Sequence, residues 1–219
     1  MSTQLSETEV RVLGSLVEKQ LTTPEYYPLT MNALTAACNQ KSNRDPVMTL
    51  GETEIQSAID RMRDLNLVYL FYGSGTRTVK YKHMLPSVYE LDPAGTAVMT
   101  VLMLRGTQTI GEIRDRTGRL FEFRDLNEVQ AALDELTRRD EPLIVKLERQ
   151  PGQKEARYAH LLSGEVDASK FAAAERTPGG AGASASNERL EKLESEVERL
   201  SSELSEFRAM FDEFRKQFD

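Results

Sequence analysis

The sequence predicts an α+β protein in which two tandem winged-helix domains are followed by a C-terminal coiled-coil helix. One helix-like segment occurs twice, as EIQSAIDRM from Glu54 and as EVQAALDEL from Glu128. Each copy is followed by two β-rich runs joined by glycine or proline, and three helices followed by a hairpin is the winged-helix arrangement. Residues 189–219 carry apolar side chains alternately three and four positions apart, which is typical of a coiled coil.

The two helical segments are related by a constant offset, since 128 − 54 = 74. The identical pairs are Glu54/Glu128, Gln56/Gln130, Ala58/Ala132 and Asp60/Asp134. The two histidines of the chain occur in YKHML and YAHLL and are related by 160 − 83 = 77. We therefore interpret His83 and His160 as equivalent positions of a repeated unit. A metal site is the alternative, but two nitrogen ligands are fewer than the four that a structural zinc requires.

The first unit is predicted to contain three helices and a hairpin. Ser6 and Glu9 form an S-x-x-E capping box for a helix over 6–20. Thr30 can cap a short second helix, and Gly51 begins a third helix whose apolar residues form one stripe. VYLFY and TRTVKYKH are joined by Gly-Ser-Gly and predict a hairpin.

The second unit repeats this order. Asp92 and Pro93 open a very apolar helix, residues 109–117 form a short one, and Asp125 caps the third because Glu128 follows three positions later. LIVKL and ARYAHLL form the second hairpin. The repetition makes the fold prediction stronger than either copy alone would.

The remaining sequence divides into a linker and a helix. GEVDASKFAAAERTPGGAGASASNE is small, polar and glycine-rich and is expected to be a flexible linker. The predicted organisation is a first domain at 1–90, a second at 91–163, the linker at 164–188 and the coiled-coil helix at 189–219. The helical seam consists of Leu190, Leu193, Val197, Leu200, Leu204, Phe207, Phe211, Phe214 and Phe218. It predicts a homo-oligomer; the alternatives are a helix folded back onto the globular domains or a contact with another protein.

Composition narrows the functional classes. The net charge is −7, and a single cysteine excludes an internal disulfide and a multi-cysteine zinc site. We expect a cytoplasmic protein, because the chain begins without a signal-peptide pattern and contains no apolar run of membrane-spanning length. No phosphate-binding loop or nucleophile elbow occurs. We expect a non-enzymatic protein without a metal or another cofactor.

The best candidates for binding nucleic acid are polar residues of the first unit. They are Asn39, Gln40, Lys41, Ser42, Asn43 and Arg44 in the loop before the third helix, and Arg77, Lys80 and Lys82 in the first wing. Such side chains can contact phosphates or base edges. The alternative is that the loop residues cap helices and brace the loop, and that the lysines form an ordinary solvated face.

Charge weakens the expectation of DNA binding. Residues 1–90 contain 9 Lys+Arg against 10 Asp+Glu, and residues 91–163 contain 11 against 12. Glu52 and Glu54 also stand at the start of the third helix, where base contacts usually arise and where carboxylates repel phosphates. The leading hypothesis is a regulatory protein that binds double-stranded DNA, and the alternative is a protein–protein interaction module.

TTPEYYPLTMNALTAACNQKSNRDPV, at 22–47, resembles the signature of the YceH family of uncharacterised bacterial proteins. The resemblance covers nearly all of residues 5–162, and its NQKSNRDPV portion is specific. It implies a tandem winged-helix fold and no catalytic residues. Gly51 departs from the family pattern, in which a serine is more usual at that position.

Overall fold

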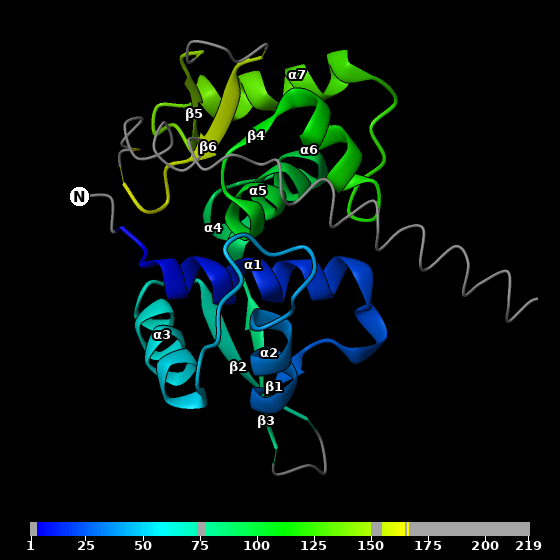
Figure 1. The fold of residues 1–219 in the computed structure, drawn as a ribbon. Coiled ribbons are helices and arrows are strands. Elements are labelled where there is room, and N and C mark those ends of the chain that lie inside the picture. Colours follow the sequence, from blue (N-terminus) through cyan, green and yellow to red (C-terminus); the bar gives the residue numbers. More distant parts are fainter. Residues whose placement is uncertain (1–3, 74–77, 150–154, 165, 167–219) are drawn as a thin grey trace, which may run out of the picture. The chain divides into compact units, whose positions relative to one another are not determined.

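A computed structural model describes residues 4–73, 78–149, 155–164 and 166. These residues lie within one compact unit bounded by Met1 and Val166. Over the described ranges the chain forms seven α-helices and two three-stranded antiparallel sheets (Figure 1). The predicted α+β class is therefore confirmed.

The first sheet is built around a hairpin, as predicted. In chain order the elements are α1 (Glu7–Thr22), the 3-10 helix η1 (Pro24–Tyr26), β1 (Leu29–Thr30), α2 (Met31–Cys38), α3 (Glu52–Asp64), β2 (Val68–Tyr72), β3 (Val79–His83) and α4 (Leu85–Val88). Ser6 and Glu9 form the expected capping box, and the Thr30 hydroxyl accepts a hydrogen bond from the Ala33 N–H. The strand order is β1-β3-β2, so β2 is an edge strand.

The second sheet has the same topology. Its segment contains α5 (Pro93–Arg105), β4 (Gln108–Thr109), α6 (Ile110–Thr117), α7 (Leu126–Thr137), β5 (Ile144–Leu147) and β6 (Arg157–His160). Asp92, Thr109 and Asp125 cap α5, α6 and α7. The strand order β4-β6-β5 corresponds to β1-β3-β2, so the sequence repeat is also a repeat of structure.

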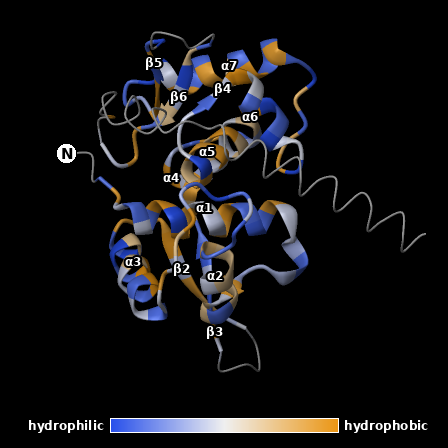
Figure 2. Ribbon diagram, in the orientation of Figure 1, coloured by the Kyte–Doolittle hydropathy of each residue, from blue (hydrophilic) through white to orange (hydrophobic). Residues whose placement is uncertain are grey.

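Helix α1 lies at the centre of the unit. All residues from Glu9 to Glu18 are buried, because α2 and α3 pack against one part of the helix and α5 packs against another. Helix α5 is largely hydrophobic along its length (Figure 2) and is buried from Ala94 to Leu104. The contact is close at Gly14, where an added Cβ would lie 3.0 Å from Leu104 Cδ2.

Three charged side chains of α1 are buried, and each has partners. Glu9 accepts a hydrogen bond from the Ser6 N–H at 2.7 Å and pairs with Arg61. Arg11 donates to the backbone carbonyls of residues 38 and 46 at 3.3 and 2.6 Å. The third, Glu18, binds Arg44. These bonds allow a helix with polar residues to be buried on all sides.

The linker prediction and the coiled-coil prediction fall almost entirely outside the described residues. Leu190, Leu193, Val197, Leu200, Leu204, Phe207, Phe211, Phe214 and Phe218 all belong to that part of the chain. The predicted homo-oligomer therefore stays a prediction. None of the helices that are described is long and apolar enough to cross a membrane.

Candidate functional site

Arg44, a predicted phosphate contact, is buried inside the protein. Its guanidinium donates to both carboxylate oxygens of Glu18, at 3.0 and 2.6 Å. It also donates to the carbonyl oxygens of Ala37 and Asn43. The Arg44 side chain has no exposed surface, and that of Glu18 is 11% exposed. The structure therefore places Arg44 in a core ion pair, where it cannot reach a phosphate.

The two asparagines of the same loop also make internal contacts. The Asn39 amide donates to the Leu50 carbonyl at 2.8 Å and accepts from the Leu50 N–H at 2.7 Å. Asn43 has a positive φ of 60° and accepts a hydrogen bond from Arg105 at the end of α5. The neighbouring Asp45 N–H donates to the Leu104 carbonyl at 2.9 Å. The loop thus fastens the first segment to α5, as the bracing alternative expected.

The other loop candidates are more accessible. Lys41 and Ser42 are exposed, and Gln40 is half-buried. Gln40, Ser42 and Asn43 line a cavity of about 400 Å³ between the loop and the ends of α1, α5 and α6. The loop thus connects the first segment to α5 through its buried residues, and its more accessible side chains line part of a cavity.

The first hairpin presents two lysines beside exposed aromatic rings. Lys80 lies opposite Phe71, and Lys82 lies opposite Tyr69. Alternation along the strands therefore puts these four side chains on one face. Tyr69 is 49% exposed and Phe71 is 46% exposed. Arg77, the third predicted wing cation, lies outside the described residues.

The exposed surface at the start of α3 is acidic. Glu52 and Glu54 are exposed in its first turn, and the Glu54 carboxylate accepts from the Gly51 N–H at 2.8 Å. Further along, Arg61 pairs with Glu9 and Arg63 pairs with Asp60. Helix α3 therefore does not form one continuous basic surface with Lys41, Lys80 and Lys82.

The two histidines occupy equivalent positions, as the repeat predicted. His83 pairs with Val68 at the end of β3, and His160 pairs with Ile144 at the end of β6. Burial lowers the pKa of His83 to about 4, with a smaller contribution from the Lys82 charge, and burial lowers the pKa of His160 to about 4. Each ring has one inaccessible nitrogen without a hydrogen-bond partner. Among the described residues no group of three or more potential metal ligands occurs.

These histidines make stability depend on pH. An unfolded histidine has a pKa near 6.5, so below that pH the unfolded state binds protons that the folded state does not. We expect full stabilisation above about pH 6.5, and each histidine to contribute a loss of about 2 kcal/mol as the pH falls to about 5. Urea unfolding of the wild type, His83→Gln and His160→Gln at both pH values measures this. Each variant should lose less stability on acidification, and an unchanged loss would refute the assignment.

One repeated hydrogen-bonded chain was not predicted. Tyr81 donates through its hydroxyl to Gln56 at 3.1 Å, and the Gln56 amide donates to Asp60 at 3.0 Å. The equivalent bonds join Tyr158, Gln130 and Asp134 at 3.4 and 2.7 Å. The identity of both Gln/Asp pairs in the repeat was the available signal. Each chain ties the third helix of its segment to the last strand.

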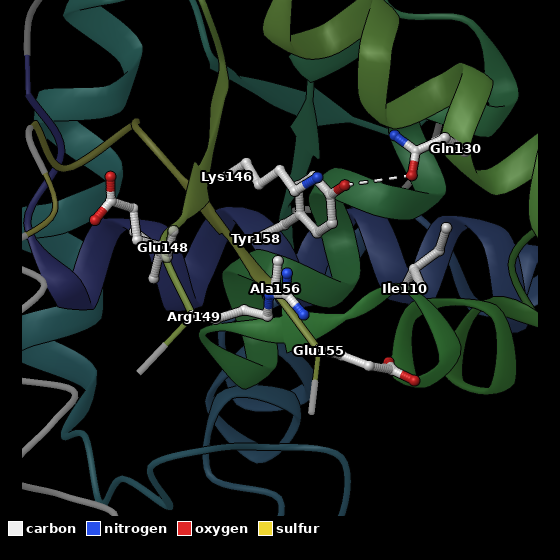
Figure 3. Close-up of a pocket in the computed structure, with 9 residues that line it drawn as sticks. Ile110, Gln130, Lys146, Glu148, Arg149, Glu155, Ala156 and Tyr158 are labelled. Atoms are coloured by element: carbon white, nitrogen blue, oxygen red, sulfur yellow. Dashed lines mark hydrogen bonds between the residues drawn. The ribbon is translucent and has the colours of Figure 1, made fainter. Parts of the chain in front are cut away.

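A second cavity, of about 500 Å³, lies between α6, α7 and the second hairpin (Figure 3). Tyr158 and Gln130 are joined across it by their hydrogen bond, and Lys146 lies 5.9 Å from the Tyr158 ring centre. Glu148, Arg149 and Glu155 lie in the connection between β5 and β6, beside residues that the structure does not describe. The lining offers mixed charges rather than one class of ligand.

Cys38 has the environment of a packed core residue. The side chain is fully buried, and burial raises the pKa of its thiol to about 11. A neutral buried thiol is a poor nucleophile. Cys38 is therefore a packed core residue of α2.

Comparison with known proteins identifies relatives along most of the chain. A family model described as "Protein of unknown function, DUF480" matches residues 5–153. A UPF0502 protein of Citrifermentans bemidjiense is 50% identical over 197 residues, covering 90% of each chain. UPF0502 proteins of Geobacter sulfurreducens and Vibrio atlanticus are 50% and 46% identical over 201 and 202 residues, covering 90% of this chain and 90% and 92% of their own. The resemblance to an uncharacterised bacterial family is confirmed at this level, and the YceH name stays a prediction.

Proposed function

The chain belongs to the DUF480 family of proteins of unknown function, and we propose that it is a non-enzymatic tandem winged-helix protein that binds another protein through its first hairpin. The order of helix, short strand, two helices and hairpin in each segment supports the winged-helix assignment. The buried neutral histidines and the buried thiol favour a non-enzymatic role.

The observation that carries the proposal is the exposure of β2. Tyr69, Phe71 and Tyr72 are 49%, 46% and 65% exposed, although aromatic side chains of this size are usually well buried. In the described part of the chain β2 pairs only with β3, so its other edge has backbone groups available to a further strand. Exposed aromatic residues along an open edge favour the addition of an extended segment of a partner.

The second segment provides an internal comparison. Its edge strand β5 has Lys146 at the position equivalent to Leu70, because these residues pair with Tyr158 and Tyr81 respectively. Pro142 precedes β5 and Glu148 follows it. Charges and proline are the usual protection of an edge strand against pairing. The sequence VYLFY of β2 has neither, so of the two described edge strands β2 has the features of a docking edge and β5 does not.

The lysines define the chemistry of the partner. Lys80 and Lys82 lie on the same face as Phe71 and Tyr69, one strand further from the open edge. An extended segment beside β2 would place alternate side chains against the two aromatic rings, and acidic side chains would reach the lysines. We infer that the partner contributes an extended segment with apolar and acidic residues.

The sequence also predicted binding to double-stranded DNA. Lys41, Lys80 and Lys82 remain accessible cations, but Arg44 is buried and Glu52 and Glu54 occupy the start of α3. A helix start with this charge would repel the phosphates beside a major groove. These positions favour a protein partner over a DNA duplex.

Cross-linking tests the proposed surface. A photoreactive phenylalanine analogue is placed at position 71 or, as the matched control, at position 147 of the other edge strand. Partners recovered only from position 71 are purified and titrated with the wild type, Phe71→Ser and Leu147→Ser. We expect Phe71→Ser to weaken binding by about 30-fold, as for an aromatic hot spot, and Leu147→Ser to leave it unchanged.

A titration with duplex DNA distinguishes the alternative. We expect the wild type and a Lys80→Ala/Lys82→Ala variant to give the same result with duplex DNA, with no salt-sensitive binding that depends on these two lysines. Salt-sensitive duplex binding that depends on these lysines and persists in Phe71→Ser would instead establish DNA as the partner. Equal weakening of the purified partner by Phe71→Ser and Leu147→Ser would refute the docking surface.

A further inference from the structure

The cavity behind the loop of residues 39–51 lies where the two repeated segments meet. Its walls come from the end of α1, the loop, the last turns of α5, and the end of α6 with the residues that follow it. Its volume of about 400 Å³ falls in the range of small-molecule sites. Within the part of the chain that the structure describes, these four segments supply the lining.

Positive charge predominates in the lining. The basic lining residues are Lys19, Arg105, Arg116 and Arg119, and the acidic ones are Glu18 and Asp115. Both oxygens of Glu18 already accept hydrogen bonds from Arg44, so the charge of Glu18 is balanced from behind the wall. Burial and the Arg116 charge lower the pKa of Arg105, which agrees with a concentration of cations.

The basic side chains are not needed to satisfy the free carbonyl groups at the ends of α1 and α6. Thr22 and Thr23 donate through their hydroxyls to the Glu18 and Lys19 carbonyls, at 2.8 and 3.2 Å. At the end of α6, the Leu120 and Phe121 N–H groups both donate to the Thr117 carbonyl, at 2.6 and 2.8 Å. Basic residues often satisfy such carbonyls. Here the chain has done so already. Lys19 and Arg116 do have acidic partners, Glu18 at 3.6 Å and Glu112 at 3.5 Å, so an anion in the cavity would share these cations with the two carboxylates.

The neutral lining completes the character of the site. Gln40 and Ser42 contribute an amide and a hydroxyl, and Thr100, Val101 and Leu104 contribute a less polar wall. We propose that this cavity binds a small phosphate-bearing molecule, with its phosphate held by Arg105, Arg116 and Arg119 and its remaining part against α5. Guanidinium groups suit this ligand, because their N–H groups match phosphate oxygens in pairs. Polar residues of the NQKSN motif would then serve a cavity rather than a DNA surface.

Calorimetry on the full chain tests the site with four probes at constant ionic strength. The probes are pyrophosphate, adenosine monophosphate, ribose 5-phosphate and phosphate-free adenosine. We expect saturable binding of at least one phosphate compound with a Kd below about 1 mM, and none of adenosine. A bound ligand should also raise the Tm, since it stabilises only the folded protein.

Charge-matched variants locate the binding. Arg119→Gln removes a cation from the cavity and should weaken binding about tenfold. Arg138→Gln removes the same charge from a side chain that is 76% exposed at the end of α7, and should leave binding unchanged. The proposal is overturned if no phosphate compound binds below about 10 mM, if adenosine binds as well as the phosphates, or if both variants weaken binding equally.

Discussion

Replacing Glu18 with alanine is expected to destabilise the protein by about 3–5 kcal/mol, because the buried Arg44 charge would lose its carboxylate partner. The pair is bidentate at 3.0 and 2.6 Å, and the Arg44 side chain is fully buried. The remaining partners of Arg44 are carbonyl oxygens, which do not neutralise its charge. Urea unfolding followed by circular dichroism measures the loss.

Two further variants give this expectation its controls. A Glu18→Met/Arg44→Met double variant removes both charges and should recover much of the stability, since a buried pair can often be replaced by apolar residues. Arg124→Ala breaks an ion pair on a side chain that is 86% exposed and should cost less than about 1 kcal/mol. If Glu18→Ala cost no more than Arg124→Ala, the pair would have no special part in the core.

Replacing Gly14 with valine is expected to cost about 3 kcal/mol by forcing α1 and α5 apart. An added Cβ would lie 3.0 Å from Leu104 Cδ2, 3.1 Å from Leu104 Cγ and 3.2 Å from Met103 Cβ. Valine adds two more methyl groups in the same confined place. Alanine should cost less, because its better helix propensity, worth about 1 kcal/mol, offsets part of the crowding. Thermal and urea unfolding of both variants measure the series.

Gly111 provides the matched control for Gly14. It lies in α6, where the nearest atom to an added Cβ is the Thr109 hydroxyl oxygen at 4.0 Å. Gly111→Val should therefore change stability by less than about 1 kcal/mol. Equal losses at the two positions would show that α1 and α5 do not meet as closely as the structure indicates.

Local chemistry made much of the fold predictable from the sequence. Ser6, Thr30, Asp92 and Asp125 cap the helices that they were expected to begin, because a cap depends on residues only three positions away. The hairpins followed from β-rich runs on either side of a turn. The two-residue strands β1 and β4 were missed, since they are too short for periodicity to reveal and are strands only through pairing with a distant hairpin.

The role of the loop could not be predicted from the sequence, because it depends on contacts between residues far apart in the chain. Arg44 and Glu18 are 26 positions apart, and Asn43 and Arg105 are 62 apart. A polar loop with an arginine has the same composition whether it contacts DNA or braces a core. Only the fold decides, and it puts Arg44 inside, Asn43 against α5, and Gln40 and Ser42 on a cavity. Lys41 and Lys82 are exposed and Lys80 is half-buried, and the charge of a lysine side chain is enough to explain these positions.

The burial of α1 on all sides has a consequence for synthesis of the protein. Residues 93–105, which form α5, leave the ribosome after every element of the first segment has been made. Until then, the surface of α1 around Gly14 has nothing to cover it. The first segment therefore stays incompletely packed until α5 has been synthesised. During that interval we expect the nascent chain to expose apolar surface to chaperones.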